Sequence, residues 1–230
     1  PHLVSGMKLS RLDRDHVTST GRLEKILADF KAGKTNTLVG TQMLVKGHDF
    51  PNVTLVVVVL ADSLLSWPDF RASERAIQVL LQVSGRAGRS NKSGEVLLQT
   101  YNTDHAVFKV LLDESSRDDF IENERQQREA LNFPPVGRMV RLRLEGRSKA
   151  EVHHQAQWLS QKLLGENKPD VAILGPSEPF IERLKGVYRW DILLKARNPS
   201  NLHALTAVAK SLSKEKRWPL LVDVDPNGLG

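Results

Sequence analysis

The first half of the chain alternates between helical and strand-like patterns of apolar residues. Apolar positions within residues 21–31 recur at i, i+3, i+4 and i+7, which predicts a helix, and a second apolar stripe predicts a helix over 71–85. Short apolar runs predict strands at 37–39, 53–60 and 94–100. Helices and strands that alternate in this way are typical of an α/β layered domain. The run at 53–60 is apolar on both faces, so we expect it to be a central strand of a covered parallel sheet.

The pattern changes after residue 112. Residues 113–135 contain seven acidic residues and three arginines, which predicts an exposed helix, and Asn132-Phe133-Pro134-Pro135 ends it because proline cannot continue a helix. The remaining residues follow the order β-α-β-β-α-β, with Ser148 and Ser200 as predicted helix caps. We therefore predict an α/β fold in three parts: a partial parallel-sheet lobe over 1–112 that lacks its opening strand, an acidic linker helix over 113–135, and a smaller α+β domain of the split βαβ (ferredoxin-like) type over 136–230.

Two predicted strands of the last domain indicate which side chains face its core. In the strand over 187–196, Tyr188 and Trp190 share a face with apolar residues, which favours packing in the core over stacking on nucleic-acid bases. In the strand that begins at residue 136, Arg141 and Arg143 lie opposite an apolar face, so we expect them on the polar side of the sheet.

Charge and composition narrow the classes of function. Residues 1–135 contain 17 of the 33 Lys and Arg residues and 17 of the 27 Asp and Glu residues, so the whole net charge of +6 belongs to residues 136–230. A basic domain suits a polyanion, and nucleic acid is a better candidate than a membrane, although charge alone fits a merely soluble domain equally well. The chain contains no cysteine, which excludes disulfides, thiol catalysis and cysteine-based metal sites within it. We predict no other metal site, because the adjacent His153 and His154 would diverge on a helix.

One glycine-rich segment places two arginines near the end of a predicted helix. Residues 82–89 read Gln-Val-Ser-Gly-Arg-Ala-Gly-Arg, so Arg86 and Arg89 each follow a glycine. Arginine donates planar, permanently charged N–H groups that suit phosphate oxygens. Such a group can neutralise the charge that develops on a phosphoryl group during nucleotide hydrolysis. The alternative is a glycine-rich turn with surface arginines.

A second segment, GTQMLVKGHDFP at 40–51, lies between two predicted strands. In α/β folds, ligands bind at the carboxyl ends of the strands, so we expect this loop and the two arginines at that edge of the sheet. Thr41 and Gln42 could contact a phosphate backbone without reading bases, and Asp49 could accept a hydrogen bond from a ribose hydroxyl. A plain connecting loop is the alternative.

In their order, these two segments resemble motifs V and VI of the superfamily 2 helicases. The longer stretches GTQMLVKGHDFPNVTLV, DFRASERAIQVLLQVSGRAGR, GEVLLQT and LVDVDP resemble the PriA family of primosomal replication-restart DNA helicases. The resemblance extends from Arg11 to Pro226. It implies that the chain is the C-terminal part of an ATP-dependent DNA helicase, with most of the second RecA-like lobe followed by a C-terminal domain.

The resemblance also implies a role for each motif residue. In the ATP site, Arg86 and Arg89 would face the γ-phosphate, Gln82 opens the same motif, and the ribose and attacking water would lie near Gly47 and Asp49. The DNA strand would contact motif V at Thr41, Gln42 and Lys46. In the basic domain, the residues that would bind nucleic acid are Arg183, Lys185 and Arg189.

Cofactors and partners follow from the same resemblance. It implies ATP and Mg²⁺ for the full-length protein, and zinc in a cysteine-rich module outside this chain. Since the chain has no G-x-x-x-x-G-K-[ST] loop and no DEAH-type acidic box, we expect no ATP hydrolysis by it alone. The implied partners are single-stranded and forked DNA, the single-strand-binding protein and other primosome proteins, in the cytoplasm at the nucleoid and away from any membrane. Two alternatives are a non-catalytic binding module and an RNA helicase fragment, because motif V–VI chemistry does not distinguish the sugars.

Overall fold

The fold is that of a computed structural model, which describes residues 6–12, 20–41, 50, 52–87, 93–166 and 168–228. The chain forms two units. The first consists of Pro1–Leu65 and Glu74–Leu112, and the second of Ser66–Ser73 and Asp113–Gly230. Nothing in the apolar pattern indicates that the short segment Ser66–Ser73 packs with the second unit.

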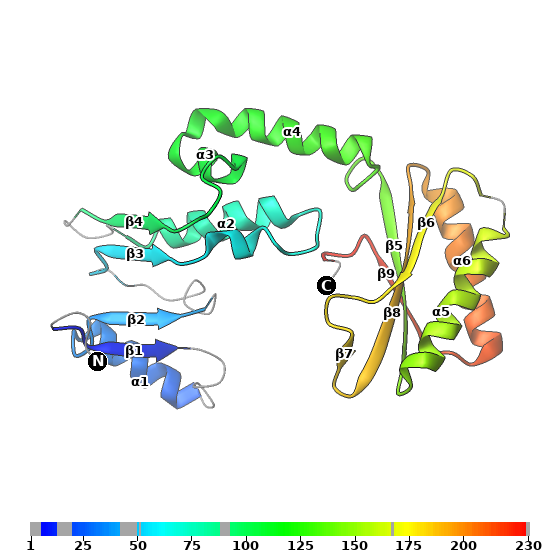
Figure 1. Cartoon of the computed structure of the whole chain (residues 1–230), viewed down its shortest axis with the longest axis horizontal. Helices are drawn as coiled ribbons and strands as arrows, with labels where there is room; N and C mark the ends of the chain where they lie inside the picture. Colours follow the sequence, from blue (N-terminus) through cyan, green and yellow to red (C-terminus); the bar gives the residue numbers. More distant parts are fainter. Residues whose placement is uncertain are drawn as a thin grey trace. The chain divides into compact units, whose positions relative to one another are not determined.

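The first unit contains two pairs of parallel strands, each with a helix between its strands in the chain (Figure 1). β1 (Leu9–Leu12) pairs with β2 (Thr37–Gly40) across α1 (Thr20–Lys31). β3 (Leu55–Val58) pairs with β4 (Glu95–Leu98) across a 3₁₀ turn, η2 (Ala61–Leu64), and α2 (Ala72–Ser84). Parallel neighbours need such crossovers, because the chain must return to the start of the next strand. The helix α3 (Ala106–Leu112) follows β4.

The helices and strands predicted for this half are confirmed, with shifted bounds. The expectation of a central strand covered on both faces is not met, since Leu55 and Val57 are 51% and 53% exposed and β3 pairs only with β4 among the described residues. The sequence patterns missed β1 and α3. Although α3 buries Val107, Phe108 and Val110, its seven residues are too few to show a helical period.

The longer segment of the second unit begins with the predicted acidic helix. A 3₁₀ turn, η3 (Glu114–Ser116), leads into α4 (Arg117–Ala130), which buries only Phe120. An antiparallel sheet follows in the spatial order β6-β8-β5-β9, formed by β5 (Arg138–Gly146), β6 (Ala172–Ser177), β8 (Val187–Ala196) and β9 (Leu220–Val224). The short β7 (Arg183–Leu184) pairs with the start of β8.

Two helices, α5 (Lys149–Leu164) and α6 (Pro199–Lys216), lie on the same face of this sheet (Figure 1). Each connects two strands that have one other strand between them in the sheet. The alternation predicted for β5 and β8 is confirmed on this face, because Leu142, Leu144, Ile192 and Leu194 are fully buried against the helices. Trp190 packs against the same core, as its shared face predicted.

One of the two predicted helix caps is confirmed and the other is wrong. Ser148 caps α5, since its hydroxyl accepts a hydrogen bond from the backbone N–H of Glu151. At α6 the cap is Asn198, whose Oδ1 accepts from the backbone N–H of Ser200 at 2.9 Å. Pro199 explains the difference, because proline is favoured at the first helical position, so the cap is the residue before it, Asn198, two residues earlier than predicted.

Candidate nucleotide and nucleic-acid sites

The first candidate site lies where α2 ends. Backbone hydrogen bonds from Gly85 to Leu81 and from Arg86 to Val83 continue the helical path by one turn. Residues four apart on such a path share a side of the helix, so the exposed Gln82 and the half-buried Arg86 occupy the same side. Arg89, the second predicted arginine, lies outside the described residues.

The position of Arg86 differs from the predicted one. α2 has 13 residues, or about 20 Å of helix, and carries the chain from the end of β3 back to the start of β4. Arg86 therefore comes after the return crossing and before Glu95, at the amino-terminal edge of these strands. The carboxyl edge predicted for Arg86 is wrong, because the helix of a βαβ crossover returns the chain to the amino-terminal edge.

The segment that resembles motif V is described only near its two ends. Thr41 is exposed directly after β2, while Gln42, Lys46, Gly47 and Asp49 lie outside the described residues. Phe50 is buried against Leu12 and Leu27, and its ring meets that of Phe30 edge-on at 5.3 Å.

At the carboxyl ends of β3 and β4, the carboxylate of Asp62 stabilises the loops that follow the strands. Asp62 accepts hydrogen bonds from the backbone N–H of Tyr101 at 3.0 Å and from the hydroxyl of Thr100 at 2.8 Å. These bonds, the one from Tyr101 first, hold the pKa of Asp62 below its usual value. The carboxylate joins the two loops that leave these strands.

The second candidate site is the hairpin of β7 and β8. Lys185 and Gly186 have φ of 51° and 86°, the geometry of a two-residue turn that presents its side chains to solvent. Arg183 and Lys185 are exposed, and the guanidinium of Arg183 lies 5.0 Å from the ring centroid of Tyr188. Both positively charged groups are accessible to a phosphate.

Arg189 does not fit the phosphate contact predicted for it. Its side chain is only 6% exposed, and its guanidinium donates to the backbone carbonyl of Ile181. Burial, and to a lesser degree the nearby Arg143, lowers the pKa of Arg189. The alternation of β8 placed Arg189 on the polar face, but it could not show that the segment before β7 covers that face.

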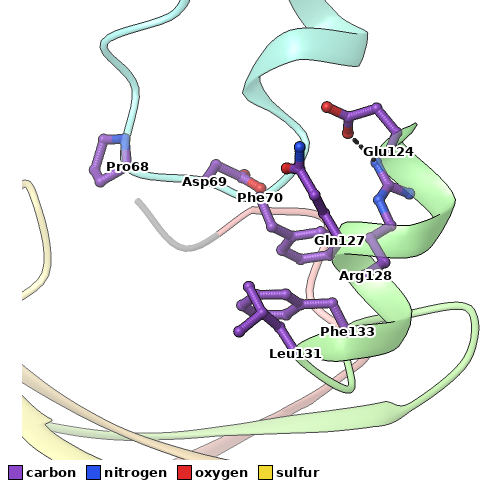
Figure 2. A pocket seen from close by; sticks show the side chains of 8 residues that line it. All are labelled: Pro68, Asp69, Phe70, Glu124, Gln127, Arg128, Leu131 and Phe133. Atoms are coloured by element: carbon purple, nitrogen blue, oxygen red, sulfur yellow. Dashed lines mark hydrogen bonds and ion pairs between the residues drawn. The ribbon is translucent and has the colours of Figure 1, made fainter. Parts of the chain in front are cut away.

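A hollow of about 290 Å³ lies within the second unit, between Ser66–Ser73 and the end of α4 (Figure 2). Inside it the rings of Phe70 and Phe133 stack, with centroids 4.7 Å apart and planes 6° from parallel. Arg128 lies over Phe70 at 5.3 Å and is paired with Glu124 at 3.4 Å. Lys195 covers Phe133 at 4.3 Å, and burial lowers the pKa of Lys195. The positive charges of Arg128 and Lys195 therefore contact aromatic rings and a carboxylate of the same unit. This is typical of a packing contact within the unit.

Among the residues that the structure describes, no group of three or more His, Asp or Glu side chains could hold a metal ion. The same residues include no helix that is long and apolar enough to cross a membrane.

Comparison with known proteins matches each half of the chain to a domain of a known family. Residues 3–91 match the helicase conserved C-terminal domain, and residues 129–227 match the primosomal protein N C-terminal domain. The replication restart protein PriA of Haemophilus influenzae is 36% identical over 225 residues, which cover 96% of this chain and 30% of that protein. The PriA proteins of Synechocystis sp. and Bacillus subtilis are 42% and 38% identical over 188 and 215 residues, covering 80% and 94% of this chain. The chain belongs to the PriA family.

The chain corresponds to the C-terminal region of PriA, and it spans 22–30% of the length of these three relatives. The helicase match includes the loop at 40–51 and the motif around Arg86. The PriA C-terminal match includes the β7–β8 hairpin. The resemblance inferred from the motifs is therefore confirmed at the level of the family.

Proposed function

We propose that this chain is the part of a replication-restart DNA helicase that completes an ATP site and holds DNA. The observation that carries the proposal is the order of two segments that both lie within the match to the helicase conserved C-terminal domain. The segment 40–51 precedes β3 in the chain, and the motif around Arg86 precedes β4. Of these segments, Arg86 is placed at the end of α2, and Phe50 is buried against Leu12 and Leu27.

In this proposal Arg86 and Arg89 neutralise the charge that develops on the γ-phosphate of ATP, which belongs to a site otherwise supplied by another part of the protein. Gln82, on the same side of the helix as Arg86, contacts the phosphates or the attacking water. Gly47 and Asp49 bind the ribose side. Thr41, Gln42 and Lys46 contact the DNA backbone where the loop leaves β2.

The cofactors would be ATP and Mg²⁺, with the metal held by residues outside this chain. Zinc would likewise belong to another part of the full-length protein, since this chain has no cysteine. We therefore expect the isolated chain not to hydrolyse ATP.

The second unit would contribute DNA binding. The net charge of +6 on residues 136–230 and the exposed Arg183 and Lys185 support contacts with phosphates of single-stranded and forked DNA. Arg189 would stabilise the hairpin through its hydrogen bond to the carbonyl of Ile181. The sheet order β6-β8-β5-β9, with antiparallel neighbours throughout, supports the split βαβ assignment for residues 136–230. We assign residues 113–135 to the linker helix. We also propose that the surfaces that bind the single-strand-binding protein and other primosome proteins lie in the C-terminal half of the chain.

The motor role is tested with Arg86→Ala and Arg89→Ala in the complete helicase. If these groups stabilise the transition state, DNA-stimulated ATP hydrolysis should fall by about 10³-fold or more. Arg22→Ala removes an exposed arginine of α1 and serves as the matched control. Unchanged hydrolysis in both variants would remove the proposed role.

The positive charge of residues 136–230 also favours a second candidate, a non-catalytic binding module. Titration of the 230-residue chain with single-stranded DNA at several salt concentrations tests it, because a binder of phosphates must lose affinity as salt rises. Parallel titration with RNA of the same sequence separates a DNA protein from an RNA protein.

A further inference from the structure

Two aromatic rings that are far apart in the sequence meet on the surface of the second unit. The ring centroids of Trp67 and Phe180 are 4.8 Å apart, and the planes are tilted by 50°. Trp67 is 39% exposed and Phe180 is 63% exposed, so contact between the rings leaves much of both accessible. Ile181 and Leu184, which follow Phe180 in the chain, are 44% and 47% exposed. Single exposed apolar residues are common, but a contiguous group of them marks a binding surface.

The segment that carries Phe180 is held in place by charged groups. The ammonium of Lys149, at the start of α5, pairs with Glu178 at 2.8 Å and with Glu182 at 3.0 Å. On the sheet side, the guanidinium of Arg189 donates to the carbonyl of Ile181, and the backbone N–H of Arg189 donates to the carbonyl of Glu182 at 2.9 Å. A surface ordered in this way loses little conformational entropy when a ligand binds.

The charges around the rings favour an anionic ligand. Lys149 pairs with both glutamates of the segment, which reduces their repulsion of a phosphate. Arg183 and Lys185 are exposed on the hairpin that continues from Phe180. Exposed aromatic faces beside mobile positive charges are how proteins hold unpaired nucleic-acid strands, since every base has a face to stack and every nucleotide has a phosphate.

We propose that Trp67 and Phe180 form a stacking site for the unpaired bases of single-stranded DNA, with Arg183 and Lys185 on its phosphates. The proposal rests on the DNA binding proposed above and adds the residues that contact bases. The aromatic residues considered from the sequence, Tyr188 and Trp190, serve the fold instead. Trp190 packs in the core and stacks on His153 at 4.1 Å, and Tyr188 is covered by Arg183.

Phe180→Ala tests the site in the 230-residue chain. Loss of one stacked base should weaken binding of a single-stranded oligodeoxynucleotide by roughly 5- to 100-fold. The slope of affinity against salt should stay unchanged, because no phosphate contact is lost, whereas Lys185→Ala should reduce that slope by about one. Phe180→Trp should restore affinity. Leu164→Ala, at a residue 62% exposed at the end of α5, is the matched control and should bind like the wild type.

An oligonucleotide that lacks bases separates stacking from a structural effect. Wild type and Phe180→Ala should bind this abasic strand equally, and a variant that fails to fold would lose both ligands together. Trp67→Phe, which keeps a ring, provides a second variant that folds and should lose less affinity than Trp67→Ala. If the wild type binds strands but Phe180→Ala and Trp67→Ala bind them equally well, the stacking site is refuted and the DNA-binding function stands. If the wild type binds no strand, DNA binding by this chain fails, and the stacking site fails with it.

Discussion

The ion pair between Arg143 and Asp191 allows a quantitative test of the packing on the face of the second unit's sheet that lies opposite α5 and α6. The two side chains lie opposite each other on β5 and β8, and the guanidinium donates to both carboxylate oxygens, at 2.7 and 2.8 Å. Only 8% of the Arg143 side chain and 6% of the Asp191 side chain are exposed. Asp191→Ala would leave a buried guanidinium without its bidentate partner. Removing one member of a buried pair costs about 3–5 kcal/mol.

We expect the lower end of this range, because Glu145 and Asp223 are near enough to raise the pKa of Arg143 together with Asp191, the largest contributor. About 3 kcal/mol should lower the melting temperature of a unit of this size by roughly 12 °C. The measurement is thermal unfolding followed by circular dichroism or tryptophan fluorescence. In the double variant Arg143→Met with Asp191→Leu, stability should return close to the wild type, since apolar replacements of a buried pair are often neutral. A melting temperature of Asp191→Ala within about 1 °C of the wild type would refute the reasoning, as would a double variant as unstable as the single one.

Two further predictions concern α4 and α6. Hydrogen bonds from Arg125, and then from Gln126, lower the pKa of Glu122 to about 2, so the stabilisation from this carboxylate is present above its usual pKa of about 4 and is lost as the pH falls toward 2. A carboxyl titration by NMR should show this value in the wild type and one near 4 in Arg125→Met, and equal values in the two proteins would contradict the assignment. At α6, Asn198→Ala should lower the free energy of unfolding by about 1 kcal/mol in urea denaturation, because it removes the cap. Ser200→Ala keeps the backbone donor and should change little, so equal losses would show that Asn198 is not the cap.

The sequence predicts most of the second unit because its elements are long. The predicted strand bounds 187–196 match β8, and the helix capped by Ser148 matches α5. Ten or more residues display a period clearly, and the core of a small sheet covered on one face follows directly from that period. The cap at Asn198 could also be predicted from the sequence, since an Asn-Pro pair before an apolar helix is as strong a signal for a helix start as the serine that follows it.

Long-range packing explains what the sequence missed. Alternation shows that Arg141, Arg143 and Arg189 share a face, but not that these side chains are buried. Asp191 and Asp223 pair with two of them from neighbouring strands, and the segment before β7 covers the third. The contact between Trp67 and Phe180 is likewise absent from any local pattern, because Trp67 reaches the second unit only through the segment Ser66–Ser73.

The position of Arg86 depends on topology alone. Because ligands of α/β folds bind at the carboxyl ends of parallel strands, the sequence predicts both motifs at the carboxyl edge of the sheet. In a βαβ unit, however, a residue just after the crossover helix must lie at the opposite edge, whatever its chemistry. In the chain, the segment 40–51 directly precedes β3, and the motif around Arg86 directly precedes β4. An arginine at this edge cannot reach a nucleotide bound at the carboxyl edge of its own strands. The proposed ATP site therefore requires phosphates presented by a separate body of protein, and this requirement is a physical reason to expect no hydrolysis by the chain alone.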